Sequence, residues 1–134
     1  MTNIYILTEH GNDYTDEGIL CVKEEIKDLG ITDELQFTTG RTLNKPKVLL
    51  ELLKDDEPSV VMLSMPNRRI YFYEKNINAL VEGLEEQIEE KGTDDFSVWD
   101  SLYEFIMSVD DQMREIHERK EKEKAQKNNA TDTQ

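Results

Sequence analysis

The residues best suited to chemistry lie in the segment TEHGNDYTDEG, from Thr8 to Gly18. Glu9 and Asp13 carry carboxylates, the oxygen ligands that divalent cations such as Mg²⁺ prefer, and His10 could act as a general acid or base. We therefore take Glu9, His10 and Asp13 as candidate metal-binding or catalytic residues. The same residues would also suit a turn followed by the acidic first turn of a helix, so a connecting loop is the alternative.

The expected position of this loop follows from three strand-like segments. Residues 3–8 are apolar on both alternations, as in a strand covered on both faces of an α/β sheet, and residues 34–39 and 60–63 also have strand chemistry. Loops at the carboxyl ends of parallel strands gather at one edge and often bind the ligand. We therefore expect the polar side chains that follow the three strands to converge: Glu9, His10 and Asp13; Thr38, Thr39 and Arg41; Ser64 and Asn67.

Helical patterns separate the strands and follow them. Apolar residues recur at helical spacing over 19–29, 46–53 and 77–91 and again from 98. Residues 69–74 have strand chemistry, and their short separation from residues 60–63 favours a hairpin. The order β-α-β-α-β-β-α-α predicts a small α/β domain with a mixed sheet of three to four strands and an acidic C-terminal helical pair. Right-handed crossovers would place the first strand beside the third, the second at an edge and the fourth next to the third.

The segment from Gly40 to Asn67, GRTLNKPKVLLELLKDDEPSVVMLSMPN, resembles the helix-strand-turn unit of response-regulator receiver domains, including the Met-Pro after the third strand. In that family an Asp that accepts phosphate ends this strand, and here the position is Ser64. The family also has an acidic pair after the first strand, where this chain has Thr8 and Glu9. The resemblance therefore implies an α/β topology without the phosphoacceptor.

The hairpin carries a small basic and aromatic group, formed by Arg68, Arg69, Tyr71, Tyr73 and Lys75. Such a group could bind a phosphate or a nucleic-acid base. The alternative, which the acidity of the chain favours, is a hairpin tip with solvated arginines.

The formal net charge is −14, and residues 82–111 alone contain eleven acidic residues and one lysine. This charge repels nucleic-acid phosphates and anionic membranes, so we expect neither as a direct partner and instead expect a protein with a basic surface. An acidic helical track can imitate the phosphates of DNA, as small acidic inhibitors do, including phage-encoded ones. The alternative is the ordinary polar side of two amphipathic helices. The candidate partner-binding residues are Glu82, Glu85, Glu86, Glu89, Glu90, Asp94, Asp95, Asp100 and Glu104.

The last helix carries an apolar stripe that suits a partner helix or a second copy of the chain. It comprises Val98, Trp99, Leu102, Phe105, Ile106, Val109, Met113 and Ile116. We expect residues 1–118 to form a single domain and residues 119–134, which are charged and nearly free of apolar side chains, to form a disordered tail.

These patterns favour a cytoplasmic protein-binding regulator or inhibitor that needs no cofactor. A metal- or phosphate-dependent enzyme with its site at the carboxyl ends of the strands is one alternative, and a helix-mediated dimer or assembly component is another. The single cysteine, Cys21, lies in a helical pattern and is expected to be partly buried.

Overall fold

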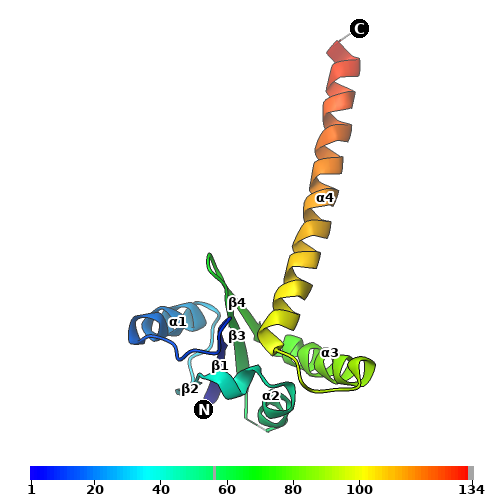
Figure 1. The fold of residues 1–134 in the computed structure, drawn as a ribbon. Coiled ribbons are helices and arrows are strands. Elements are labelled where there is room, and N and C mark those ends of the chain that lie inside the picture. Colours follow the sequence, from blue (N-terminus) through cyan, green and yellow to red (C-terminus); the bar gives the residue numbers. More distant parts are fainter. Residues whose placement is uncertain (56, 133–134) are drawn as a thin grey trace. The chain divides into compact units, whose positions relative to one another are not determined.

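The protein is described by a computed structural model that covers residues 1–55 and 57–132, with the side chains of 110, 112–114, 117 and 124–132 outside the description. The predicted order of elements is confirmed, with one short 3-10 helix in addition (Figure 1). The elements are β1 (Thr2–Leu7), α1 (Asp16–Asp28), β2 (Leu35–Thr38), η1 (Arg41–Asn44), α2 (Pro46–Leu53), β3 (Ser59–Ser64), β4 (Arg69–Tyr73), α3 (Lys75–Lys91) and α4 (Val98–Asp132).

The four strands form one mixed sheet in the order β2-β1-β3-β4. β1 is parallel to both β2 and β3, and β4 pairs antiparallel with β3, so that Ile4 lies opposite Val60 and Met62 lies opposite Tyr71. The α/β class and the predicted strand order are therefore confirmed. β1 and β3 lie side by side, while the connection after β1 leads through α1 to β2 and the hairpin after β3 leads to β4 on the other side. The carboxyl ends of β1 and β3 are therefore a topological switch point.

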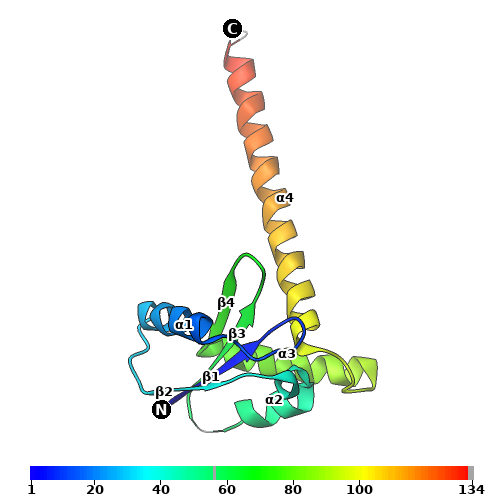
Figure 2. The same cartoon turned by 60° about the vertical axis from the view of Figure 1, so that its left-hand side comes forward.

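The sheet is covered on both faces, as the apolar strands predict. α1 lies on one side of the sheet, and α2 and α3 lie on the other (Figures 1 and 2). On the α1 side the buried cluster contains Ile4, Ile6, Val22, Ile26, Val60 and Met62. The alternate strand positions Tyr5, Leu7, Val61 and Leu63 are also buried, as are apolar residues of α2 and α3. A strand whose alternating residues are all buried lies inside a three-layer fold.

The chain divides into two compact units, Met1–Ser101 and Leu102–Gln134. The first unit holds the sheet, α1 to α3 and the first turn of α4, where Val98 and Trp99 are buried and Trp99 Nε1 donates to the backbone oxygen of Ser64 at 3.1 Å. The single domain expected over residues 1–118 stays a prediction.

α4 continues beyond residue 118, as far as Asp132. Glutamates four residues before a base, as in Glu115–Arg119 and Glu118–Lys122, favour such an exposed helix.

The apolar stripe of α4 is only partly covered. Leu102 and Ile106 are buried, whereas Phe105, Val109 and Ile116 are 61%, 40% and 43% exposed. Met113 belongs to the same stripe in the sequence, and its side chain lies outside the described part. Cys21 is exposed rather than partly buried, because the buried side of α1 is formed by Val22 and Ile26.

Candidate functional site

The loop between β1 and α1 lies against η1, which follows β2. The backbone oxygen of Thr8 accepts hydrogen bonds from Asn44 Nδ2 and from the Gly11 N–H, each at 3.2 Å. Gly11 is buried with φ of 68°, and a Cβ at this position would come within 2.9 Å of Arg41 Cα. Both the positive φ and the close backbone approach require glycine, so Gly11 fixes the path of the loop.

The same loop joins the carboxyl ends of both neighbouring strands. Thr39 Oγ1 donates to Asp13 Oδ1 at 3.1 Å, just after β2. Ser64 Oγ, at the end of β3, donates to the hydroxyl of Tyr14 at 3.4 Å. The structure thus brings Asp13 to Thr39, and it brings Ser64 to Tyr14, a residue that the sequence analysis did not single out.

Glu9 and His10 do not join these contacts. Their side chains are 56% and 75% exposed, and His10 Nε2 lies 4.0 Å from Glu9 Oε2, the geometry of a weak surface ion pair. Within the described part of the chain, no three His, Cys, Asp or Glu side chains are grouped so that they could hold a metal ion. A metal or acid-base role for Glu9, His10 and Asp13 stays a prediction.

The absence of a side chain at Gly18 leaves the space that the Tyr14 ring occupies. A Cβ on Gly18 would lie 2.4 Å from Cε2 of Tyr14, which is far inside van der Waals contact. Gly18 stands in the first turn of α1, whose N-cap Thr15 accepts the Gly18 N–H through its Oγ1 at 3.0 Å. The ring can therefore pack over the start of the helix and direct its hydroxyl to Ser64.

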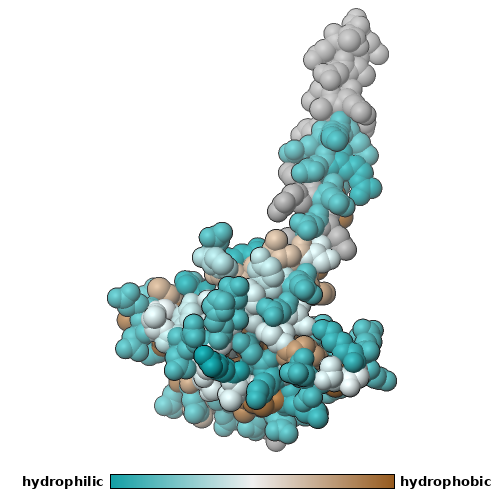
Figure 3. Space-filling view, in the orientation of Figure 1, coloured by the Kyte–Doolittle hydropathy of each residue, from teal (hydrophilic) through white to brown (hydrophobic). Residues whose placement is uncertain are grey.

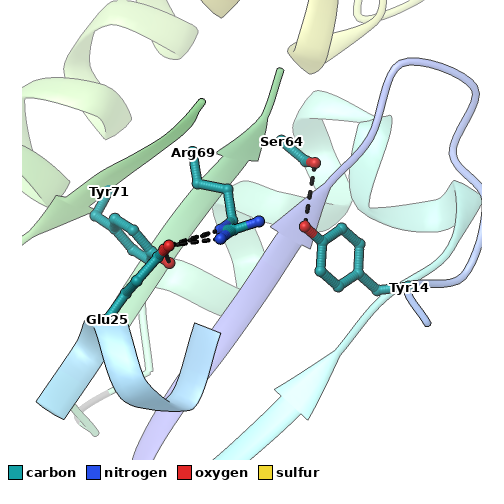
Figure 4. A network of polar contacts seen from close by, with 5 residues as sticks. All are labelled: Tyr14, Glu25, Ser64, Arg69 and Tyr71. Atoms are coloured by element: carbon teal, nitrogen blue, oxygen red, sulfur yellow. Dashed lines mark hydrogen bonds and ion pairs between the residues drawn. The ribbon is translucent and has the colours of Figure 1, made fainter. Parts of the chain in front are cut away.

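A second polar cluster lies beside the Tyr14–Ser64 pair and joins β4 to α1 (Figure 4). Arg69 donates to the Glu25 carboxylate from Nε, at 2.9 and 3.0 Å, and from Nη2, at 2.6 Å, while the Tyr71 hydroxyl donates to the same carboxylate. Charge-assisted pairs with two parallel bonds are among the stronger polar contacts in proteins. The expectation that Arg69 is solvated at the hairpin tip is therefore wrong, because Glu25 of the facing helix reaches it.

The cluster shifts the protonation of its members. The hydrogen bonds from Arg69 lower the pKa of Glu25, and the bond from Tyr71 adds to this effect against the opposing influence of burial. The Glu25 carboxylate, and next the Tyr14 hydroxyl, raise the pKa of Arg69. Burial raises the pKa of Tyr71, and its bond to Glu25 raises it further. At neutral pH the cluster thus holds a carboxylate, a guanidinium and a neutral phenol.

The acidic candidates lie on the surface. Glu82, Glu85, Glu86, Glu89 and Glu90 of α3 are exposed, as are Asp95, Asp100 and Glu104, while Asp94 is partly covered. Two lysines approach this group. Lys47 Nζ, from α2, lies 3.6 Å from Asp94 Oδ2, and Lys54 Nζ, at the C-terminal end of α2, lies 3.6 Å from Glu85 Oε1. Exposed pairs of this kind are weak, so they leave most of the negative charge uncompensated.

A pocket of about 500 Å³ lies at the opposite end of the sheet, where β1 and β3 begin and β4 ends. Its lining includes four carboxylate residues, Asp33, Asp55, Glu57 and Glu74, over an apolar floor that contains Leu53 and Ile77. This pocket is far along the strands from Ser64 and Asp13, so the candidate residues of the loop after β1 do not line it.

Comparisons with protein-family models, with curated proteins and with solved structures give no match. The fold and the contacts above therefore carry the functional argument. Among the residues that the structure describes, no helix combines the length and the apolar character needed to cross a bilayer.

Proposed function

We propose that this chain is a non-enzymatic regulator or inhibitor that binds a basic surface of another protein through the acidic side of α3 and the loop that follows it. The observation that carries the proposal is the arrangement of five glutamates on α3. The spacing of these glutamates along the chain is i+3, i+1, i+3 and i+1, so they share one face of the helix, and all five are exposed. They are Glu82, Glu85, Glu86, Glu89 and Glu90.

The acidic face of α3 carries very little compensating positive charge of its own. Between residues 82 and 101 the chain has eight acidic residues and a single lysine, Lys91. The ammonium group of Lys91 lies 4.4 Å from the centre of the Phe96 ring. Hydrophilic side chains cover much of α3 in the space-filling view (Figure 3). Fixed carboxylates on a helix attract a basic partner at long range and speed its association.

The partner class follows from this charge. A protein groove that holds nucleic-acid phosphates presents clustered Lys and Arg side chains, and a row of exposed carboxylates complements it. We propose that the chain acts as a mimic of nucleic acid, in the manner of small acidic inhibitors that phages encode. The proposal includes a cytoplasmic location, which fits a chain whose single cysteine, Cys21, is an exposed free thiol.

The test compares two charge reversals of equal size. One variant carries Glu86→Lys, Glu89→Lys and Glu90→Lys on α3, and its control carries Glu24→Lys, Asp28→Lys and Glu34→Lys at exposed positions around α1. We expect the wild type and the control to capture the same partner from lysate of the source cell, and the α3 variant to lose it. Duplex DNA should compete for the captured partner. Capture that survives in the α3 variant would overturn the role of the acidic face of α3. Capture that DNA does not affect would overturn the mimicry of nucleic acid.

A helix-mediated assembly is a second candidate, which the exposed apolar residues of α4 favour. Phe105, Val109 and Ile116 are spaced by four and seven residues and so share one stripe of the helix. Exposed apolar stripes of this kind mark contact surfaces more often than isolated exposed residues do. The mass of the protein in solution tests this candidate.

A further inference from the structure

We propose that Tyr14, Ser64 and Arg69 form a binding site for a phosphate group at the carboxyl ends of β1 and β3. The three side chains come from the loop after β1, from the end of β3 and from the start of β4. Figure 4 shows the Arg69 guanidinium between the Glu25 carboxylate and the Tyr14–Ser64 pair. This site is separate from the acidic face of α3.

The donors of Arg69 are only partly used. Glu25 accepts from Nε and Nη2, and the Tyr14 hydroxyl is a further hydrogen-bond partner of Arg69. Because a guanidinium has five N–H groups, these contacts leave donors for another acceptor. In Figure 4 the remaining nitrogen points toward the Tyr14–Ser64 pair. An oxyanion beside that nitrogen would receive charge-assisted hydrogen bonds without breaking the contact to Glu25.

The two hydroxyls supply further donors. Ser64 Oγ donates to the Tyr14 oxygen at 3.4 Å, which is long for a bond between two hydroxyls. Each hydroxyl can rotate to donate to a phosphate oxygen instead. Ser64 and Tyr14 are neither buried nor fully exposed, and the Arg69 side chain is 30% exposed, so a ligand can reach all three from solvent.

The place in the fold suits a ligand that binds at the end of the sheet. β1 and β3 are adjacent strands whose connections lead apart, and ligands of α/β sheets bind at the carboxyl ends of such strands. Glu25 and Arg69 neutralise each other, and Asp13 accepts a hydrogen bond from Thr39. Asp16 and Glu17 at the start of α1 oppose an anion, so we expect affinity in the millimolar rather than the micromolar range.

The experiment is a ¹H–¹⁵N NMR titration with inorganic phosphate at constant ionic strength, with acetate in a parallel arm. We expect saturable shifts at Gly18, Ser64 and the Arg69 Nε–H. Tyr14→Phe and Ser64→Ala should each weaken phosphate binding about tenfold, the effect of losing one hydrogen bond to a charged group. Tyr73→Phe and Ser59→Ala make the same chemical changes at the other ends of β4 and β3, and they should bind as the wild type does.

A further variant tests the role of Arg69 without removing it. Glu25→Gln takes away the carboxylate that competes for the guanidinium, so phosphate should bind more tightly than to the wild type. Absence of saturable shifts in the wild type, unchanged affinity in Tyr14→Phe and Ser64→Ala, or acetate binding as tight as phosphate would each overturn the proposal. The backbone spectra of the variants show in the same samples that they are folded.

Discussion

Arg69 Nη2 donates to Glu25 Oε1 at 2.6 Å, and this pair ties the edge strand β4 to the helix α1. β4 is hydrogen-bonded to one neighbouring strand only, β3, so its other edge contributes nothing to holding it in the sheet. The Glu25 carboxylate also accepts from Tyr71, two residues further along β4. One helical side chain thus contacts two alternate residues of the edge strand.

Glu25→Gln should reduce the free energy of unfolding by about 1 kcal/mol, because a neutral amide with one acceptor oxygen replaces the charged carboxylate that Arg69 contacts, and both side chains are partly exposed. Urea unfolding followed by circular dichroism measures the change. Glu24→Gln is the matched control, because Glu24 is the exposed neighbour on the same helix and should change stability by less than about 0.5 kcal/mol. Equal effects of the two variants would contradict a stabilising role for the pair.

The contribution of Glu25 should depend on pH in a defined direction. The hydrogen bonds from Arg69 hold the pKa of Glu25 below its ordinary value of 4.5, so the folded state favours the carboxylate. The resulting stability is fully present above pH 4.5 and is lost as the pH falls through the lower pKa of the folded state. The difference in unfolding free energy between wild type and Glu25→Gln should therefore be constant near pH 7 and vanish in acid. A difference that persists at low pH would show that packing, rather than charge, is its cause.

Gly18→Ala should destabilise the protein although alanine favours helices. A Cβ at Gly18 would lie 2.4 Å from the Tyr14 ring, whereas a Cβ at Gly83 in α3 would meet nothing within 4 Å. Gly83→Ala should therefore raise the free energy of unfolding by about 1 kcal/mol through helix propensity, and Gly18→Ala should lower it as the ring is displaced.

A double-mutant cycle identifies the ring as the cause. In the Tyr14→Ala background the clash is gone, so Gly18→Ala should become stabilising, as Gly83→Ala is. Thermal or urea unfolding of the four proteins gives the coupling. If Gly18→Ala has the same effect with and without Tyr14, the packing of this ring over α1 is not what requires glycine.

The sequence predicted the sheet well because its signals are local and redundant. Ile4 and Ile6 alternate with Tyr5 and Leu7, all buried, so the strand had to be covered on both faces. The handedness of crossovers then determined which strands are neighbours. The hairpin of β3 and β4 followed from the short turn between them.

The contacts of the candidate site were less predictable, because they join residues distant in the chain. Glu25 and Arg69 are 44 positions apart, and Tyr14 and Ser64 are 50 apart. In the sequence Glu25 is one of several charges on the polar side of a helix, and nothing distinguishes it from Glu24. The two glycines at 11 and 18 were a usable signal, since each makes room for a specific neighbour, Arg41 or Tyr14. The acidic residues of α3 were placed correctly on the surface, where helical periodicity puts them.

The exposed stripe of α4 should govern the mass of the protein in solution. Apolar side chains at positions 105, 109 and 116 lie on one face, and a second helix packed against them would remove them from water. Light scattering coupled to size-exclusion chromatography should give about twice the chain mass of 15.7 kDa at high concentration. Phe105→Ser with Val109→Ser should return the mass to that of one chain, while Glu104→Ser with Asp111→Ser, at exposed polar positions of the same helix, should not. Circular dichroism checks that both variants keep their helix content. A wild type that has the mass of one chain at every concentration would exclude a second copy as the partner of this stripe.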